Sequence, residues 1–328
     1  MRSLFALALG LMFGLLAAGM TSAEPERPVS FTNSIGMHFI GIPAGSYQRG
    51  SNPRQLQRAR DDFERITGKP FDSAWNRRFL KRETPAHTVQ LTQSFYLAST
   101  EVTLEQFGLF VGETGYVTAA EKSGGGWVYQ DGRWQVAPGA SWINPFGDKR
   151  SFEELADHPV VQVSWHDAAA FIDWLNKKEG IQKYRLPTEA EWEFACRNGG
   201  LDQLYSWSGR VPAANVADQT SARQFAWPYS FLDYADGYAE TAPVGSFPGN
   251  ELGLLDMLGN VWEWCADTFD EYQPGSHTNP LNDRPGDFKV IRGGSWCQNP
   301  LFDRCALRGK YMPANYIDFL GFRVACDK

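Results

Sequence analysis

Short helices with clear start signals, set among long stretches rich in glycine, proline and asparagine, most constrain the fold of this 328-residue chain. Alternating apolar residues predict short strands over 37–42, 87–97, 289–292 and 321–324. Elements this short, with no linker between them, predict an α+β fold with little regular secondary structure, in a single domain over residues 28–328. Three helix starts carry a Ser or Thr cap with a reciprocal partner three residues later: Thr103 with Gln106, Ser164 with Asp167, and Thr188 with Glu191.

The composition permits one sizeable core and argues against nucleic acid as a partner. Hydrophobic residues make up 43% of the chain and aromatic residues 14%, and a domain of up to about 250–300 residues can form a single unit. Acidic side chains outnumber basic ones by 38 to 31, which gives a formal charge of -7. Because a nucleic-acid-binding surface needs clustered Lys and Arg, we expect neither DNA nor RNA to bind.

The first 23 residues are typical of a signal peptide. Arg2 precedes an almost wholly apolar run over residues 4–18, and small residues ending at Ala23 suit cleavage there. We therefore expect a periplasmic or secreted protein that begins near Glu24, with a charge of 30 minus 38, or -8. No later run reaches the roughly 20 apolar residues that a membrane span needs. The alternative is an uncleaved membrane anchor, for which the apolar run is short.

A charged segment over residues 52–82 interrupts the pattern of short elements. Four apolar residues between 56 and 66 have helical spacing, which predicts an inserted surface helix followed by a loop. Because Phe71, Trp75 and Phe79 lie among basic residues, we expect part of a partner-binding surface. The alternatives are a solvated face without a role, and aromatics that pack the insertion onto its own domain. The basic residues are Arg54, Arg58, Arg60, Arg77, Arg78, Lys81 and Arg82.

The cysteines and histidines limit the expected chemistry. Export permits disulfides, and an odd number of cysteines leaves at least one thiol unpaired in a monomer. No CxxC or HExxH pattern is present, so a zinc site has little support. The five cysteines are Cys196, Cys265, Cys297, Cys305 and Cys326.

A series of motifs runs through the chain in order: NSIGM (33–37), IPAG (42–45), EVT (101–103), HPVV (158–161), VSW (163–165), RLPTEAEWE (185–193), GNVWEW (259–264), RGGS (292–295) and LGFR (320–323). Together they resemble the formylglycine-generating enzyme (sulfatase-modifying factor) family over nearly the whole chain, apart from residues 52–82. The resemblance implies a single-domain variant of the C-type-lectin fold, poor in secondary structure and often stabilised by calcium.

The resemblance also implies two structural calcium sites. Calcium takes about six to eight oxygen ligands, which carboxylates and loop backbone supply. The first set is the carboxylates of Asp256 and Glu263 with the carbonyls of Gly259 and Val261. The second set is the Asn215 side chain, the Val216 carbonyl, Asp236 and the Tyr238 carbonyl. Alternatively, Asp256 and Glu263 only cap turns.

The catalytic signature of the family is incomplete in this chain. In the family, a Cys three residues after the serine of RGGS and another five residues further on bind copper(I), which prefers soft thiolates. Here Cys297 follows Ser295 by two residues, and Phe302 stands five residues after Cys297. We therefore expect no two-thiolate copper site, although Cys265 remains a distant candidate ligand. The resemblance places four residues in the equivalent cleft: Trp262, Ser295, Cys297 and Arg308. The alternative for these residues is core or loop packing.

The family's disulfides are retained only in part. Cys196 and Cys305 resemble one family pair, and closing a loop of about 110 residues would remove roughly 4–5 kcal/mol of unfolded-state freedom. The positions of the other family disulfide hold Ile172 and Val324, as expected if packing replaced that bridge. Three cysteines are then left, and each is either a buried inert thiol or has a further role: Cys265, Cys297 and Cys326.

Three functions fit the resemblance. The first is a binding or regulatory protein that acts on a periplasmic protein partner, like the accessory protein of type VI secretion that has this fold. The second is a periplasmic oxidoreductase of altered chemistry, like the relative that acts in pyoverdine chromophore maturation. The third, a true formylglycine generator, needs the two thiolates. We expect calcium as a structural cofactor, no copper, and no activity as an ordinary formylglycine-generating oxidase.

Overall fold

The computed structural model describes residues 29–328 with the exception of 72, 149, 210–211, 226–232 and 300. The predicted signal peptide over residues 1–23 lies outside the described residues. Within the described ranges, no helix combines the length and the apolar character that crossing a membrane requires.

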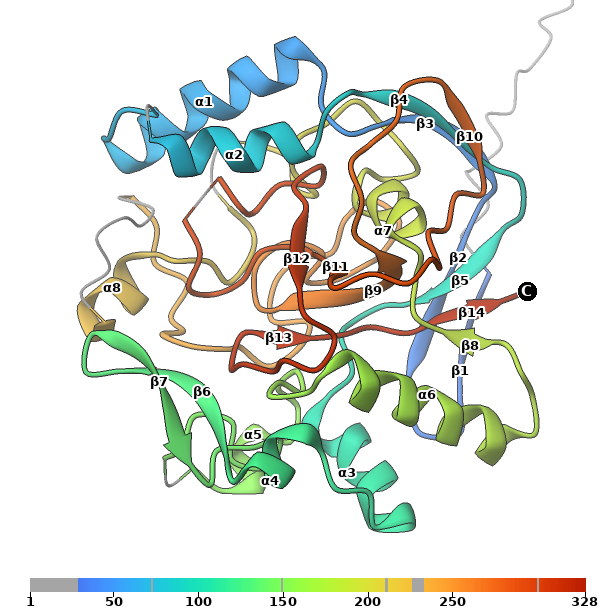
Figure 1. Ribbon diagram of the computed structural model, residues 1–328, viewed down its shortest axis with the longest axis vertical. Helices are drawn as coiled ribbons and strands as arrows, with labels where there is room; N and C mark the ends of the chain where they lie inside the picture. Colours follow the sequence, from blue (N-terminus) through green and yellow to red (C-terminus); the bar gives the residue numbers. More distant parts are fainter. Residues whose placement is uncertain (1–28, 72, 149, 210–211, 226–232, 300) are drawn as a thin grey trace, which may run out of the picture.

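Small sheets form the framework of the described chain (Figure 1). An antiparallel five-stranded sheet joins, in this order, β1 (Ser30–Thr32), β2 (His38–Ile42), β5 (Phe95–Ala98), β14 (Ala325–Asp327) and β8 (Tyr184–Arg185). A four-stranded sheet joins β12 (Gly309–Tyr311), β11 (Lys289–Arg292), β9 (Trp262–Thr268) and β13 (Leu320–Gly321). A three-stranded sheet joins β10 (Ser276–Thr278), β4 (His87–Leu91) and β3 (Gly45–Arg49). The last pair is the hairpin of β6 (Gly125–Gln130) and β7 (Arg133–Pro138).

Short helices connect and cover these sheets. They are α1 (Pro53–Thr67), α2 (Ala74–Arg82), α3 (Leu104–Thr114), α4 (Ala119–Ser123), α5 (Phe152–Leu155), α6 (Trp165–Glu179), α7 (Glu189–Cys196) and α8 (Gln219–Phe225). All three predicted capping boxes form, at the starts of α3, α6 and α7. This arrangement of short helices and several sheets confirms the predicted α+β class.

Two strand predictions need correction. The stretch over 87–97 is two strands, β4 and β5, which belong to different sheets. The strand predicted over 321–324 is wrong, because β13 ends at Gly321. The next residues leave the sheet, and the Arg323 guanidinium pairs with Glu263 and donates to the Ala98 carbonyl. The carbonyls of Phe322 and Val324 accept from the N–H groups of Val102 and Ala98 instead of continuing the pairing with β9.

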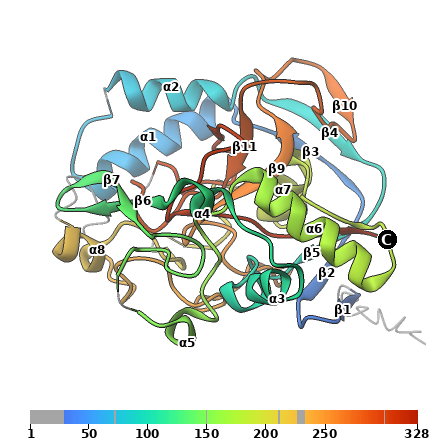
Figure 2. The same ribbon diagram turned by 60° about the horizontal axis from the view of Figure 1, so that its bottom comes forward.

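The inserted segment forms two helices rather than the predicted helix and loop. Residues 74–82 form α2, which begins at Ser73, whose hydroxyl accepts a hydrogen bond from the Asn76 N–H. Phe79 and Leu80 bury the inner side of α2, which is the tertiary packing that a short amphipathic helix needs. In both views α1 and α2 lie along each other at one edge of the molecule (Figures 1 and 2).

Buried ion pairs hold the long connections together. Four arginines are among the largest fully buried side chains, and each contacts a buried glutamate. The pairs are Arg197 and Arg292 with Glu193, Arg304 with Glu83, and Arg323 with Glu263. Arg304 with Glu83 and Arg292 with Glu193 join segments that no sheet or helix connects. Arg323 lies just after β13, the strand that pairs with β9 at Glu263, and Arg197 caps the helix that carries Glu193. Removing one partner of such a pair leaves an uncompensated buried charge, so these pairs fix the relative positions of the loops.

Candidate functional site

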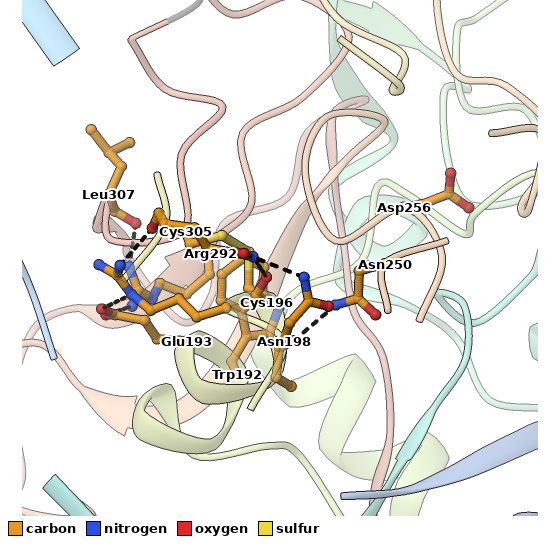
Figure 3. Close-up of a disulfide and its surroundings, with 12 residues drawn as sticks. Trp192, Glu193, Cys196, Asn198, Asn250, Asp256, Arg292, Cys305 and Leu307 are labelled. Atoms are coloured by element: carbon orange, nitrogen blue, oxygen red, sulfur yellow. Dashed lines mark hydrogen bonds and ion pairs between the residues drawn. A yellow bond between two sulfur atoms is a disulfide. The ribbon is translucent and has the colours of Figure 1, made fainter. Parts of the chain in front are cut away.

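A disulfide joins α7 to the segment that follows β11. Cys196 and Cys305 are bonded, with their Cα atoms 5.6 Å apart and a sequence separation of 109, which confirms the predicted pairing (Figure 3). Cys265, Cys297 and Cys326 are free and buried. Ile172 and Val324, at the positions of the family's other disulfide, are buried in the same apolar cluster. Packing therefore takes the place of that bridge.

Two glutamates of α7 organise the ion network beside the disulfide. The Glu193 carboxylate accepts hydrogen bonds from Arg292, Arg197 and the Gly50 N–H, and Figure 3 shows Glu193 beside Arg292. The Glu189 carboxylate binds Arg308 at 2.5 and 2.8 Å. Arg308 also lies 3.7 Å from the centre of the Tyr272 ring. The remaining Arg308 nitrogen, Nη1, donates to the carbonyls of Arg82 and Asp270. Arg308 lines one side of a hollow of about 390 Å³.

Cys297 is a buried thiol rather than an exposed nucleophile. It is 6% exposed, and its Sγ lies 3.4 Å from the Ser295 Oγ and 3.6 Å from the Gln298 Nε2. Burial raises the pKa of Cys297 well above its usual range, and Asp318 and Asp303 add to the rise. Metal binding and nucleophilic attack both need the thiolate, so the surroundings of Cys297 suppress both.

Phe302, which stands five residues after Cys297 in the sequence, packs between the insertion and β9. Its ring lies 4.5 Å from the ring of Phe79 on α2 and 6.2 Å from that of Trp262 on β9. All three side chains are at least nine-tenths buried. Phe71 is buried as well, against Phe63 of α1. The alternative that aromatics pack the insertion onto its own domain is therefore correct for Phe71 and Phe79.

The second candidate thiol for a copper pair lies elsewhere in the core. Cys265 belongs to the apolar cluster around Trp192 and the disulfide, whereas Cys297 belongs to the cluster around Trp262 and Phe302. Burial raises the pKa of Cys265 as well. Neither thiol has the electropositive surroundings that favour a thiolate.

A buried ion pair locks the insertion onto the same segment. The Arg304 guanidinium donates to both oxygens of Glu83, at 2.9 and 2.7 Å. Glu83 directly follows α2 and also accepts from the Ser51 hydroxyl at 2.5 Å. Glu83 and Arg304 are fully buried. The insertion and the residue that follows it therefore contact the segment over residues 295–305 through both an aromatic stack and an ion pair.

Of the four predicted cleft residues, the structure brings three together. Trp262, Ser295 and Cys297 are all buried, and Trp262 and Cys297 share the apolar cluster that contains Phe302. Arg308 is separate, because its guanidinium points into the Glu189 network. Core packing, the alternative given for these residues, describes them better than an open cleft.

The first predicted calcium set lies in a buried acidic group. The Asp256 carboxylate accepts from the Gly245 N–H at 2.6 Å, and burial raises its pKa to about 6. Both oxygens of Glu263 accept from Arg323 at 2.7 Å, so Glu263 would have to share them with a cation. Glu101, which the sequence analysis did not assign to this set, has one buried oxygen without a hydrogen-bond partner among the described residues. Three carboxyls around one arginine leave an excess of negative charge that suits a cation.

In the second predicted calcium set, one buried amide oxygen lacks a hydrogen-bond partner among the described residues. The Oδ1 of Asn215 is buried, and the described part of the chain offers it no hydrogen-bond partner. Asp236 accepts from the N–H groups of Val216 and Tyr238, which brings these three predicted residues together. Burial raises the pKa of Asp236 to about 7, and the neighbouring Asp218 adds to the rise. An unpaired amide oxygen beside two carboxyls fits a hard cation.

Glu101 and Asp218 are the site residues that sequence reasoning missed. Glu101 lies in the motif over 101–103, which was the only signal for it, and Asp218 lies in no motif. Within the described residues, no three His, Cys, Asp or Glu side chains converge in an arrangement for a metal ion. Both candidate calcium sets therefore depend on amide and backbone oxygens. The carbonyls of Gly259 and Val261 remain predicted ligands of the first set.

Comparisons with known proteins agree with this architecture. The model of the sulfatase-modifying factor enzyme 1-like domain matches residues 27–328. The formylglycine-generating enzyme of Thermomonospora curvata is 37% identical over 336 residues, which cover 94% of this chain and 99% of that protein. The inactive C-alpha-formylglycine-generating enzyme 2 of Mus musculus is 35% identical over 266 residues, which cover 74% of this chain and 78% of that protein.

The solved structure of PvdO from Pseudomonas aeruginosa is similar in fold. Its TM-score is 0.65 at 25% identity, and the match covers 93% of this chain and 100% of that one. The fold, the disulfide and the matched domain point in the same direction. The chain belongs to the formylglycine-generating enzyme (sulfatase-modifying factor) family, as a member in which the copper-binding cysteine pair is incomplete.

Proposed function

We propose that this protein is an exported, calcium-stabilised binding or regulatory protein that acts on a periplasmic protein partner, as in activation of type VI secretion. One observation carries the proposal: Phe302 stands at the sequence position where the family's second thiolate is expected, and its ring packs between Phe79 of the insertion and Trp262. A two-thiolate copper site built on Cys297 would need a thiolate at that position. Helix α2 packs on the segment over residues 295–305 through Phe79 and exposes Trp75 on its outer side.

The similarity to proteins named as inactive supports this reading. The mouse relative is called an inactive formylglycine-generating enzyme, so loss of the activity with retention of the fold has a parallel in this family. The segment over residues 1–23 has the composition of an export signal. A protein of this design would act by contact rather than by oxidation.

The calcium part of the proposal rests on the unpaired oxygens. The Oδ1 of Asn215 and one oxygen of Glu101 are buried without partners among the described residues. A buried acceptor without a partner costs roughly 1–3 kcal/mol. Calcium held by Asn215 and Asp236, and a second ion near Asp256, would satisfy these groups and offset the acidic charge.

A second candidate is a periplasmic oxidoreductase of altered chemistry, as in pyoverdine chromophore maturation. The observation that favours it is the likeness to PvdO over nearly the whole chain. The side chains available near Cys297 are those of Ser295, Asp303 and Asp318. Both carboxyls are buried and have raised pKa values, mainly through burial, so they would act as proton donors rather than as metal ligands.

A peptide assay and a capture assay separate these functions. Purified protein is incubated with copper(I), oxygen and a sulfatase-type cysteine peptide, and mass spectrometry follows formylglycine formation. The proposal expects no product, with the Thermomonospora curvata enzyme as the positive control. Product that disappears in Cys297→Ser would contradict the proposal and restore the enzyme reading. In the second arm, immobilised protein should retain a specific protein from periplasmic extract in a salt-sensitive way.

A further inference from the structure

A continuous band of cations and aromatic rings runs from α2 across the end of the four-stranded sheet. On α2, the Trp75 and Phe79 rings lie 4.9 Å apart, and the Arg82 guanidinium lies 4.1 Å from the Phe79 ring. Arg82 also lies 5.8 Å from the Phe269 ring, and the Lys310 Nζ lies 4.9 Å from that same ring. The band thus joins α2 to β12, which begins at Gly309, five residues after Arg304. Its outer end is Trp75, which is 58% exposed.

The cations of this band lack acidic partners. Arg78, Arg82 and Lys310 form no ion pair within 4.0 Å in the described part of the structure. Burial, together with the charges of Arg78 and Arg308, lowers the pKa of Arg82 to about 10. Burial also lowers the pKa of Lys310, and Arg82 and Arg78 add to that effect. Because these cations repel one another, a bound anion would reduce the repulsion and so bind favourably.

The neighbouring helix shows that this excess charge is specific to α2. Along α1, Asp62 lies 2.9 Å from Arg65 and 3.9 Å from Arg58. Four basic residues lie on α2, whose sequence AWNRRFLKR contains no acid. Glu271 and Asp287 are the acids near Lys310, and only Glu271 acts on Arg82. The positive field is therefore concentrated on one end of the insertion, in a protein whose formal charge is -7.

We propose that this surface, formed by Trp75, Arg78, Arg82 and Lys310, docks an acidic peptide segment of the partner protein, with carboxylates between the cations and an apolar side chain against Trp75. The inference rests on the proposed binding function and names the chemistry that the partner presents. Arginines beside an exposed tryptophan-bearing aromatic stack, with Arg82 4.1 Å from the Phe79 ring that contacts Trp75, match the composition of binding hot spots. A long polyanion such as nucleic acid fits worse, because the remainder of the molecule is acidic and would repel it.

The test uses a short fluorescein-labelled peptide in which Glu and Leu alternate, with a version that carries Gln in place of Glu. Fluorescence anisotropy measures binding to the mature protein at several salt concentrations. The acidic peptide should bind and the Gln version should not, and binding should weaken as salt rises. Equal binding of both peptides, or of neither, would overturn the proposal.

Two double variants with the same change in net charge locate the site. Arg78→Gln with Lys310→Gln should weaken peptide binding at least about tenfold, which is about 1.4 kcal/mol. Arg54→Gln with Arg60→Gln removes two cations from α1 and should change binding less than about twofold. Equal losses in the two variants would mean a general charge effect and would overturn the docking surface. Binding to anionic phosphatidylglycerol vesicles but not to the peptide would assign the surface to membranes and also refute it.

Failure of this inference is distinguishable from failure of the proposed function. If the wild type and the Arg78→Gln, Lys310→Gln variant capture the same periplasmic protein equally well, the binding function stands and the docking surface is wrong. If the wild type captures nothing and converts the cysteine peptide, the binding function itself fails. Thermal unfolding of both double variants serves as the folding control. The exposed changes on α1 should alter stability by less than about 0.5 kcal/mol, and the change at Lys310, which lies over the Phe269 and Phe288 rings, by about 1 kcal/mol at most.

Discussion

The oxygen-rich region around residues 215–263 and the thiol region over 295–305 have diverged in opposite ways. The first keeps carboxyls and an amide oxygen whose hydrogen-bonding capacity the protein does not use up. The second has an aromatic ring in place of a ligand, packed against an added helix. Hard-ligand sites that hold loops together serve any function of the fold, whereas soft copper ligands serve only one reaction. The difference teaches that the scaffold and the chemistry of this family are separable.

The largest effect should come from the disulfide that borders both regions. Replacing Cys196 and Cys305 with Ser should lower the free energy of unfolding by about 4–5 kcal/mol, because the bond closes a loop of about 110 residues in the unfolded chain. Urea unfolding of oxidised protein measures the loss. Cys326→Ser is the matched control, since it removes a free thiol. A loss as large in the control as in the double variant would contradict the assignment.

The next effect should come from the charge pair that holds the insertion on the thiol region. Glu83→Gln should cost about 3–5 kcal/mol, because it leaves Arg304 buried without a countercharge. Arg58→Gln, which breaks an exposed pair with Asp62, should cost less than about 1 kcal/mol. Chemical denaturation compares the two variants. Similar midpoints would show that the insertion is not anchored through Glu83.

Calcium should have a smaller effect, restricted to the oxygen-rich region. A free concentration one hundred times the dissociation constant would add about 2.7 kcal/mol to stability. Thermal unfolding with calcium and with chelator, in wild type and in Asn215→Leu, is the measurement. The variant should lose part of the stabilisation and keep the part due to the set around Asp256. Equal unfolding midpoints with and without calcium in the wild type, with no metal in the purified protein, would contradict the prediction that calcium stabilises the fold.

The smallest expected effect is on copper binding. Phe302→Cys restores a thiol to the second position, yet we expect no tight copper(I) binding, because Phe79 still fills the space and the Cys297 thiol is held protonated by burial. Competition with a colorimetric copper(I) chelator measures it. Stoichiometric copper(I) binding by Phe302→Cys would contradict this prediction, because it would show that the missing thiol alone prevents a copper site. Phe302→Ser is the control, since it removes the ring without adding a thiol.

Local signals in the sequence predicted what depends on neighbours in the chain. The capping boxes at Thr103, Ser164 and Thr188 predicted α3, α6 and α7, because an N-cap acts within one turn. The second helix of the insertion escaped prediction, since Phe79 and Leu80 are its only large buried apolar residues and their partners lie far along the chain. Tertiary contact, and not local propensity, decides such a helix.

The candidate site was predictable to the extent that motifs carry it. The Cys196–Cys305 pairing and the ligand sets followed from the family resemblance. Glu83 and Arg304 form their ion pair across 221 residues, and no spacing rule in one sequence reveals such a pair. The same holds for the role of Asp218 beside Asp236. For Arg308, the resemblance predicted a cleft position, and the Glu189 carboxylate draws its side chain away instead.

The contact between Phe79 and Phe302 also limits the mutational routes open to this chain. A two-thiolate copper site would require a thiol at position 302, where the Phe302 ring packs 4.5 Å from the Phe79 ring. Removing an aromatic ring from this stack would destabilise the fold by roughly 3–5 kcal/mol. A cysteine at position 302 therefore needs further substitutions that repack α2 against the core.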